Sequence, residues 1–189
     1  MIVGVLALQG AFAAHIEKLN GLGVQTREVR LPAHMEGVDA LVMPGGESTT
    51  MSMLLESSGL FSVVEQRLAD GMAVFGTCAG MILLANDIQD GRPDQRSFGR
   101  LAIAVQRNGY GRQIDSFETG LAVEGLDDPA HGVFIRSPRI VELDPSVTVL
   151  ATVRGDAVLV QDGNALAASF HPELSEDDRI HRLFLEALA

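Results

Sequence analysis

The stretch Phe75-Gly76-Thr77-Cys78-Ala79-Gly80 decides the fold. An apolar run, Met72–Phe75, enters it, and a helix-like run, Met81–Ala85, leaves it. A strand, a sharp turn carrying a nucleophile and a following helix form a nucleophile elbow, here with the pattern Gly-x-Cys-x-Gly. The glycines permit strained dihedral angles and a close approach of neighbouring backbone. We expect the sulfur to project at the carboxyl end of a strand, facing the positive end of a helix dipole, which favours thiolate over thiol.

Cys78 is the only cysteine among the 189 residues. A disulfide within the chain and a metal site built from several cysteines are therefore excluded. A lone cysteine is more often a small buried hydrophobic side chain than a reactive group. Its position between two glycines at a strand-to-helix turn favours the reactive interpretation.

Length and composition predict one domain, residues 1–189, that can bury a sizeable core. No apolar run reaches the roughly 18 residues of a membrane-spanning helix, and Met1–Leu8 is typical of a strand rather than a signal peptide. The 25 acidic and 14 basic residues give a formal net charge of −11. Because phosphate binding needs basic patches, no nucleic-acid partner is expected. We expect a cytoplasmic protein with no membrane partner, no metal and no cofactor.

In the first half of the chain, apolar runs typical of strands in a parallel sheet alternate with stretches of helical spacing. The predicted strands are Ile2–Leu8, Val24–Leu31, Val38–Met43 and Met72–Phe75. The predicted helices are Ala11–Asn20, Thr49–Ser57 and Leu60–Ala69. This alternation predicts an α/β fold with a three-layer, doubly wound, mostly parallel sheet of the flavodoxin-like kind.

The second half contains shorter strand-like runs, which indicate antiparallel strands joined to the parallel core. These runs are Ala102–Gln106, Gly132–Ile135, Ile140–Leu143, Val147–Val153, Ala157–Gln161 and Ala165–Phe170. Asp162-Gly163-Asn164 is a strong hairpin-turn signal between two of them. A last helix is expected at about Ser175–Leu188, with its acidic first turn, Ser175–Asp178, as the cap.

A cysteine nucleophile needs a base, and the base needs a group that orients it. The chain has five histidines, and four fit surface or helix-packing positions: His15, His34, His131 and His181. His171 differs because it follows the apolar run Ala165–Phe170. Residues i and i+2 of an extended chain project to the same side, so Glu173 can orient His171 while the other ring nitrogen faces Cys78. Alone, His171-Pro172-Glu173 fits a strand exit equally well; the elbow favours the catalytic interpretation.

Negative charge that develops during acyl transfer needs hydrogen-bond donors. Pro44-Gly45-Gly46-Glu47-Ser48 follows the third predicted strand and should lie at the same edge of the sheet as the elbow. The N–H groups of Gly46 and Ala79 would bracket the oxyanion. Pro-Gly-Gly alone is also an ordinary turn. Nucleotide binding is disfavoured because the chain lacks the glycine patterns of nucleotide-binding loops.

The chain resembles the class I (triad) glutamine amidotransferases, through the elbow and the downstream Ser169–Glu173. It resembles more closely, over nearly its whole length, the family of glutaminase subunits of pyridoxal 5′-phosphate synthase. The blocks that carry this closer resemblance are Leu8–Ala11, Pro44–Thr50, Phe75–Gly80, Arg107–Gln113, Asp115–Glu118, Val133–Pro138 and Ser169–Leu174.

The resemblance implies hydrolysis of L-glutamine to L-glutamate and ammonia. In that reaction the Cys78 thiolate attacks the side-chain amide, His171 protonates the leaving ammonia and then activates water, and Glu173 orients His171. The Gly46 and Ala79 amides hold the oxyanion. The implied glutamine-binding residues are Gly46, Glu47, Ser48, Arg107, Ile135 and Arg136. Two arginines and one carboxylate also suit the carboxylate and ammonium of a zwitterion.

The resemblance further implies a partner, a (β/α)₈-barrel synthase subunit that receives the ammonia in a 12:12 complex. That subunit makes pyridoxal 5′-phosphate from ribose 5-phosphate and glyceraldehyde 3-phosphate, and its docking switches the glutaminase on. Gln9-Gly10 and the first helix are expected near the interface and the oxyanion loop, and the peptide after Gly45 is expected to flip. Two departures from the family pattern, Gly109 and a charged loop at Asp87–Phe98, are expected to leave the triad untouched, and the loop bears at most on partner fit.

Two alternatives stay open at this point. The same triad could supply ammonia to another acceptor, such as imidazole glycerol phosphate synthesis. The fold could also be a non-enzymatic sensor in which Cys78 is the sensing thiol. The His171–Glu173 pair argues against the sensor, because a sensor has no use for an oriented base.

Overall fold

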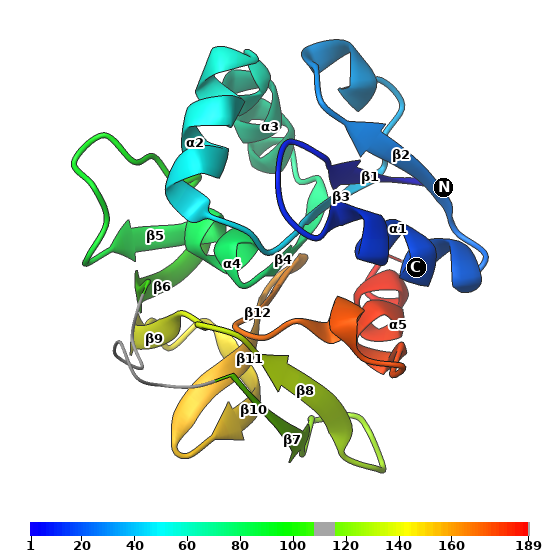
Figure 1. Ribbon diagram of the computed structural model, residues 1–189, viewed down its shortest axis with the longest axis vertical. Coiled ribbons are helices and arrows are strands. Elements are labelled where there is room, and N and C mark those ends of the chain that lie inside the picture. Colours follow the sequence, from blue (N-terminus) through cyan, green and yellow to red (C-terminus); the bar gives the residue numbers. More distant parts are fainter. Residues whose placement is uncertain (108–115, 189) are drawn as a thin grey trace.

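A seven-stranded sheet forms the centre of the computed structural model, which describes residues 1–107 and 116–188 (Figure 1). Its strand order is β10-β11-β12-β4-β3-β1-β2. Five neighbouring strands are parallel: β1 (Ile2–Leu6), β2 (Gln25–Val29), β3 (Ala40–Met43), β4 (Ala73–Thr77) and β12 (Ala165–Ala168). Antiparallel strands β10 (Thr148–Val153) and β11 (Asp156–Asp162) extend it. The order β2-β1-β3-β4-β12 is the flavodoxin-like arrangement, so the predicted fold class is confirmed.

The sheet separates two apolar clusters, because successive side chains of a strand point to opposite faces. In β3, Leu41 and Met43 join one cluster, and Ala40 and Val42 join the other. The first face is covered by α2 (Ser48–Ser57), α3 (Leu60–Ala69), α4 (Ala79–Leu84) and a small sheet of β5 (Ala85–Ile88), β6 (Leu101–Gln106) and β9 (Arg139–Leu143). The second is covered by α1 (Phe12–Gly21), α5 (Arg179–Glu186) and the pair β7 (Phe117–Leu121) and β8 (Ala130–Phe134). Two 3₁₀ turns complete the elements, η1 (Pro32–Met35) and η2 (Pro172–Leu174).

The predicted start of the last helix is wrong. The helix α5 begins at Arg179, and Ser175–Asp178 lies outside it without a side-chain cap. The carboxylate of Asp177 instead accepts a hydrogen bond from the Arg179 backbone N–H at 3.0 Å and contacts the Arg179 guanidinium at 2.7 Å. Such local side-chain bonds compete with the helix for the same backbone groups. The acidic run Ser175–Asp178 therefore stays outside the helix.

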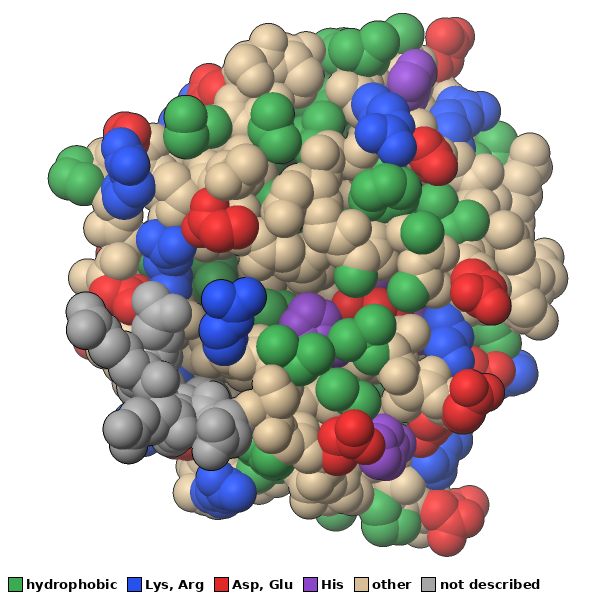
Figure 2. Space-filling model, in the orientation of Figure 1, with side chains coloured by type: hydrophobic (Ala, Val, Ile, Leu, Met, Phe, Trp, Pro, Cys, Tyr) green, Lys and Arg blue, Asp and Glu red, His purple; other side chains and the backbone are tan. Residues whose placement is uncertain are grey.

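Charged side chains of both signs are interspersed over the face shown in Figure 2. None of the helices in the described part of the chain is long and apolar enough to cross a membrane.

Candidate active site

The carboxyl ends of four parallel strands meet at one edge of the sheet. Gln9 follows β1, Gly45 and Gly46 follow β3, Cys78 follows β4, and His171 follows β12. Ligands of open α/β sheets bind at this edge, because loops from neighbouring strands converge there. The topology therefore brings together side chains from the two ends of the sequence.

Cys78 lies at a strained turn between β4 and α4. Its backbone has φ 49° and ψ −103°, a conformation that a non-glycine residue adopts only when its surroundings hold it there. The Cys78 N–H donates to the Ala168 carbonyl at 2.8 Å, which ties the turn to β12. A Cβ on Gly80 would lie 2.0 Å from the Met43 carbonyl oxygen, so only glycine fits there. The elbow predicted from Gly-x-Cys-x-Gly is thus present in the structure.

His171 lies between Cys78 and Glu173. Its Nδ1 is 2.7 Å from Glu173 Oε1, and His171 and Cys78 line the same cavity, close enough to interact. Burial alone would lower the pKa of His171, but the hydrogen bonds to Cys78 and Glu173, together with their charges, raise it to about 10. The site therefore favours a protonated imidazole at neutral pH, next to the sulfur.

The local geometry of this pair differs from the predicted extended chain. Strand β12 ends at Ala168, and Pro172–Leu174 forms the 3₁₀ turn η2. Proline fixes φ at the start of this turn, and the turn brings the Glu173 carboxylate within hydrogen-bond distance of His171 Nδ1. Glu173 is 4% exposed, so its carboxylate is shielded from water.

A cavity of about 310 Å³ opens in front of Cys78. All six residues predicted to bind substrate line it, together with Cys78 and His171. The full lining consists of Gln9, Gly46, Glu47, Ser48, Cys78, Ile82, Arg107, Ile135, Arg136 and His171. Ala79 and Glu173 lie behind this surface and are buried. Arg136 has φ 44°, a second strained non-glycine residue, which is typical of residues held in place at functional sites.

Glu47 caps helix α2 and pairs with Arg107. Its carboxylate accepts hydrogen bonds from the Thr49 and Thr50 backbone N–H groups at 3.1 and 2.7 Å. Arg107 Nη2 lies 2.8 Å from Glu47 Oε1. Burial disfavours the charged form, but the hydrogen bonds from Thr50 and Thr49 outweigh it and lower the pKa of Glu47 to about 2. The two residues predicted to bind opposite ends of glutamine therefore neutralise each other here.

Replacing Glu47 by Gln should lower the free energy of unfolding at pH 7 by about 0.5–1 kcal/mol, the low end of the range for a helix cap, because the carboxylate is half exposed and screened by solvent. The folded-state pKa lies below the ordinary value of 4.5, so the charge stabilises the fold above pH 4.5. That contribution is lost as the pH falls from 4.5 to about 2. Urea unfolding of both proteins across this range checks it; a stability difference that grows on acidification would contradict it.

One contact at the site agrees with the expected position of Gln9 near the oxyanion loop, and two have no counterpart in the sequence prediction. Gln9 Oε1 accepts from the Glu47 N–H at 2.8 Å. Gln95 Nε2 donates to Ser48 Oγ at 3.0 Å, so the loop Asp87–Phe98, which was predicted to bear at most on partner fit, also supports a site residue. His15 Nε2 lies 3.4 Å from Glu173 Oε2. A loop glutamine has no sequence signal, because its role depends only on where the loop folds.

Parts of two sequence blocks fall outside the described residues. The predicted block Arg107–Gln113 is described only at Arg107, and Asp115 and the departure at Gly109 also fall in the gap. The Arg107 backbone N–H donates to Asp90 Oδ1 at 2.6 Å, which holds the start of this block next to the cavity.

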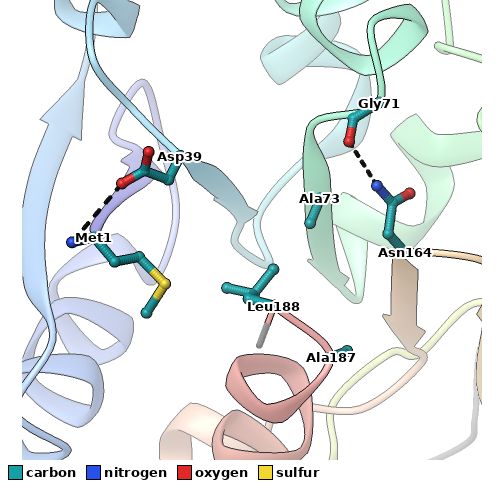
Figure 3. A pocket seen from close by; sticks show the side chains of 7 residues that line it. All are labelled: Met1, Asp39, Gly71, Ala73, Asn164, Ala187 and Leu188. Carbon is teal, nitrogen blue, oxygen red and sulfur yellow. Dashed lines mark hydrogen bonds and ion pairs between the residues drawn. The ribbon is translucent and has the colours of Figure 1, made fainter.

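A larger cavity, of about 570 Å³, opens at the opposite, amino-terminal edge of the sheet (Figure 3). The Met1 amine lies 3.9 Å from Asp39 Oδ2, and Asn164 Nδ2 donates to the Gly71 carbonyl at 2.6 Å. Its polar groups are paired with one another, and its described lining contains neither a cysteine nor a histidine. The chemistry therefore places the candidate active site in the smaller cavity.

A doubly wound sheet with a cysteine elbow at its carboxyl edge is the architecture of an α/β enzyme with a thiol nucleophile. The model of the SNO glutamine amidotransferase family matches residues 5–189. This chain belongs to that family.

Similar proteins agree with this assignment. The pyridoxal 5′-phosphate synthase subunit PdxT of Thermus thermophilus is 53% identical, over 98% of this chain and 96% of the relative. The protein of the same name from Corynebacterium jeikeium is 50% identical, over 98% of this chain and 95% of the relative. A crystal structure of a glutamine amidotransferase matches with a TM-score of 0.93 and 51% identity, over 100% of this chain and 99% of that chain. A putative GMP synthase subunit from Thermoplasma acidophilum, 18% identical with a TM-score of 0.70, shares the fold.

Proposed function

We propose that this chain hydrolyses L-glutamine to L-glutamate and ammonia, and that the ammonia serves pyridoxal 5′-phosphate synthesis. The observation that carries the chemistry is the continuous series of contacts from Cys78 to His171 to Glu173 at a strained elbow. The relatives named as pyridoxal 5′-phosphate synthase subunits support the acceptor pathway.

In the proposed mechanism the Cys78 thiolate attacks the side-chain carbonyl carbon of glutamine. The C–N bond then breaks as His171 delivers its proton to the leaving nitrogen, which departs as ammonia and leaves a glutamyl thioester. The neutral His171 next takes a proton from water, and the resulting hydroxide displaces the sulfur to give glutamate. Glu173 holds the Nδ1–H of His171 throughout, so that Nε2 faces the reaction.

The Gly46 and Ala79 N–H groups are the proposed oxyanion donors, each worth about 3 kcal/mol in the transition state. The Gly45 carbonyl accepts from the Ala11 N–H at 3.1 Å, which turns the Gly46 N–H of the same trans peptide away from Ala11. A Cβ on Gly10 would lie 1.8 Å from the Gly45 oxygen. The orientation of this peptide is therefore coupled to the start of α1, where we expect the partner to act.

Glutamine would occupy the 310 Å³ cavity in front of Cys78. Arg107 and Arg136 supply cations for its carboxylate, and Glu47 faces its ammonium. Glu47 and Arg107 are paired with each other in this structure. An incoming zwitterion would replace this ion pair by two new ones, between its carboxylate and Arg107 and between its ammonium and Glu47. Gly46, Ser48 and Ile135 complete the proposed contacts with the substrate.

The proposed partner is the (β/α)₈-barrel synthase subunit, which would take up the ammonia in a 12:12 complex. We place the complex in the cytoplasm, a compartment that keeps a free thiol reduced. An acidic chain would be steered by complementary charge on such a partner.

The direct test is glutamate release from glutamine by the chain alone and with a saturating amount of the barrel subunit. We expect slow release by the free chain and stimulation by about tenfold or more, the usual range of coupling between two sites. Activity that the barrel subunit does not change would support glutamine hydrolysis but contradict the proposed acceptor of the ammonia. No activity under either condition would favour the sensor alternative.

A further inference from the structure

Two fully buried histidines lie behind the proposed triad and have no part in the mechanism above. His15 is on α1 and His181 is on α5, and both are 0% exposed. His15 Nδ1 lies 2.9 Å from His181 Nε2, and His15 Nε2 lies 3.1 Å from Thr77 Oγ1. The same Nε2 lies 3.4 Å from Glu173 Oε2. His15 therefore contacts both the residue before Cys78 and the residue that orients His171.

The second oxygen of Glu173 explains why this contact matters. Oε1 accepts from His171, whereas Oε2 has no hydrogen bond to any group in the described part of the chain. A buried carboxylate oxygen without a donor is costly, and the terminal torsion of a glutamate is soft. In the described part of the chain, Oε2 itself has a contact with His15 Nε2, at an ion-pair distance of 3.4 Å.

The contacts of the two rings favour one position for the hydrogen on His15. Burial, followed by the charges of His181 and His171, lowers the pKa of His15 well below its ordinary value. Burial also lowers the pKa of His181 to about 4, so both rings are neutral at pH 7. A hydrogen on His15 Nδ1 would turn the Nε2 lone pair toward the Glu173 carboxylate. A hydrogen on Nε2 instead points to Glu173 and Thr77, and Nδ1 then accepts from the Nε2–H of His181.

This assignment also accounts for His181 Nδ1, which is buried and has no described partner. In the arrangement above, that atom carries a lone pair and no hydrogen. A buried nitrogen without a proton leaves no donor unsatisfied, so the assignment is consistent with the lack of a partner at His181 Nδ1.

We propose that His15 is a positioning residue of the triad: its Nε2–H holds the second oxygen of Glu173, and His181 fixes its tautomer. The proposal rests on the proposed glutaminase function. Groups that orient a reacting side chain from behind typically change activity by 10–100-fold when they are removed, as known from metal sites. His15 also connects α1, where the partner is expected to dock, with the base of the site.

The tautomer can be tested without an activity measurement. The full-length wild-type chain is labelled with ¹⁵N-histidine and studied at pH 7. Two-bond ¹⁵N–¹H correlation spectra should show His15 and His181 both as neutral Nε2–H tautomers. The signals that disappear in His15→Gln and His181→Gln assign the two rings. A hydrogen on His15 Nδ1, or a doubly protonated His15, would overturn the proposal.

The kinetic test uses the complex with the barrel subunit. His15→Leu should lower kcat for glutamate release by about 10–100-fold with little change in KM, because substrate contacts are unaffected. His15→Gln, which keeps an N–H near the Nε2 position, should recover most of the loss. The matched control is Leu19→Ala, one turn along the same helix and also fully buried, which removes packing alone and should lower Tm while kcat stays within about twofold.

Equal losses of kcat in His15→Leu and Leu19→Ala, or no recovery in His15→Gln, would mean that His15 acts through packing and would overturn the proposal. If His15→Leu does not fold, the tautomer in the ¹⁵N spectra and the kcat of His15→Gln still test the proposal. Wild type and Cys78→Ala are run in the same assay. An inactive wild type would refute the proposed function itself. An active wild type whose kcat is unchanged in His15→Leu would refute only the role of His15.

Discussion

Replacing Cys78 by Ala should reduce glutamate release by about 10⁴-fold or more, because it removes the nucleophile of the proposed mechanism. The fold should survive. Alanine keeps the Cβ that already occupies the φ 49° conformation, so the strain at the elbow does not change. The lost sulfur is small, and Cys78 as a whole is only 7% exposed. Release is measured with the barrel subunit present, and circular dichroism and Tm of the free variant report on folding.

Covalent labelling provides the control for this prediction. A glutamine-like chloroketone should add its mass to wild type at Cys78 and nowhere in Cys78→Ala, as judged by peptide mass spectrometry. Cys78→Ser keeps a group that can hydrogen-bond His171 but lacks a reactive thiolate, so it should also be nearly inactive. Substantial activity in Cys78→Ala would show that the reaction does not pass through this sulfur.

Replacing Gly45 by Ala should lower kcat by about 10²-fold, the typical effect of misplacing a catalytic group by about 1 Å. A Cβ at this position would lie 2.3 Å from His171 Cε1, 2.9 Å from His171 Nδ1 and 3.3 Å from Cys78 Cβ. The His171 ring is held by a 2.7 Å bond to Glu173 and cannot move without breaking it. Either the ring or the Gly45 loop must shift, and both changes separate the base from the sulfur.

Gly21→Ala is the matched control for Gly45→Ala. Gly21 is the last residue of α1, and an added Cβ there meets nothing within 4 Å. We expect wild-type activity and equal or slightly higher stability, since alanine is the better helix former. Steady-state glutamate release measures both variants. A Gly45→Ala variant within a few fold of wild type would mean that the loop moves freely and that the base is not confined as described.

Much of the fold could be predicted from periodicity. Four of the five parallel strands and the turn at Asp162-Gly163-Asn164 were predicted, and α3 has its predicted bounds. The strand β12 was predicted among the antiparallel strands, but it pairs parallel with β4. Strands β5 and β7 were missed. The first is a short Ala-Asn-Asp-Ile run, and the second is stabilised by its pairing with β8, including Phe117 stacked on Phe134 at 4.5 Å. Such strands depend on a partner strand and carry little pattern of their own.

The site was predictable where a residue follows a strand and less so elsewhere. The residues predicted for catalysis and binding lie at one edge of the sheet, and their roles stay predictions. His15 was interpreted as a surface or helix-packing residue. Its spacing from Phe12, Ile16 and Leu19 places it on the buried face of α1, and this was the signal that it needed a polar partner. The partner itself, Glu173, could not be found without the packing of α1 against η2.

The pairing of β12 with β4 has a consequence for the order of events during folding. Thr77, next to the nucleophile, pairs with Ala168, and most of the second half of the chain separates the two strands. Closing so long a loop is slow, and β12 must also insert between β4 and β11. A growing polypeptide therefore carries its thiol long before it carries the base. Under the proposed mechanism, glutamine hydrolysis becomes possible only after the last strand has formed, so a chain cut short by interrupted synthesis would release no glutamate.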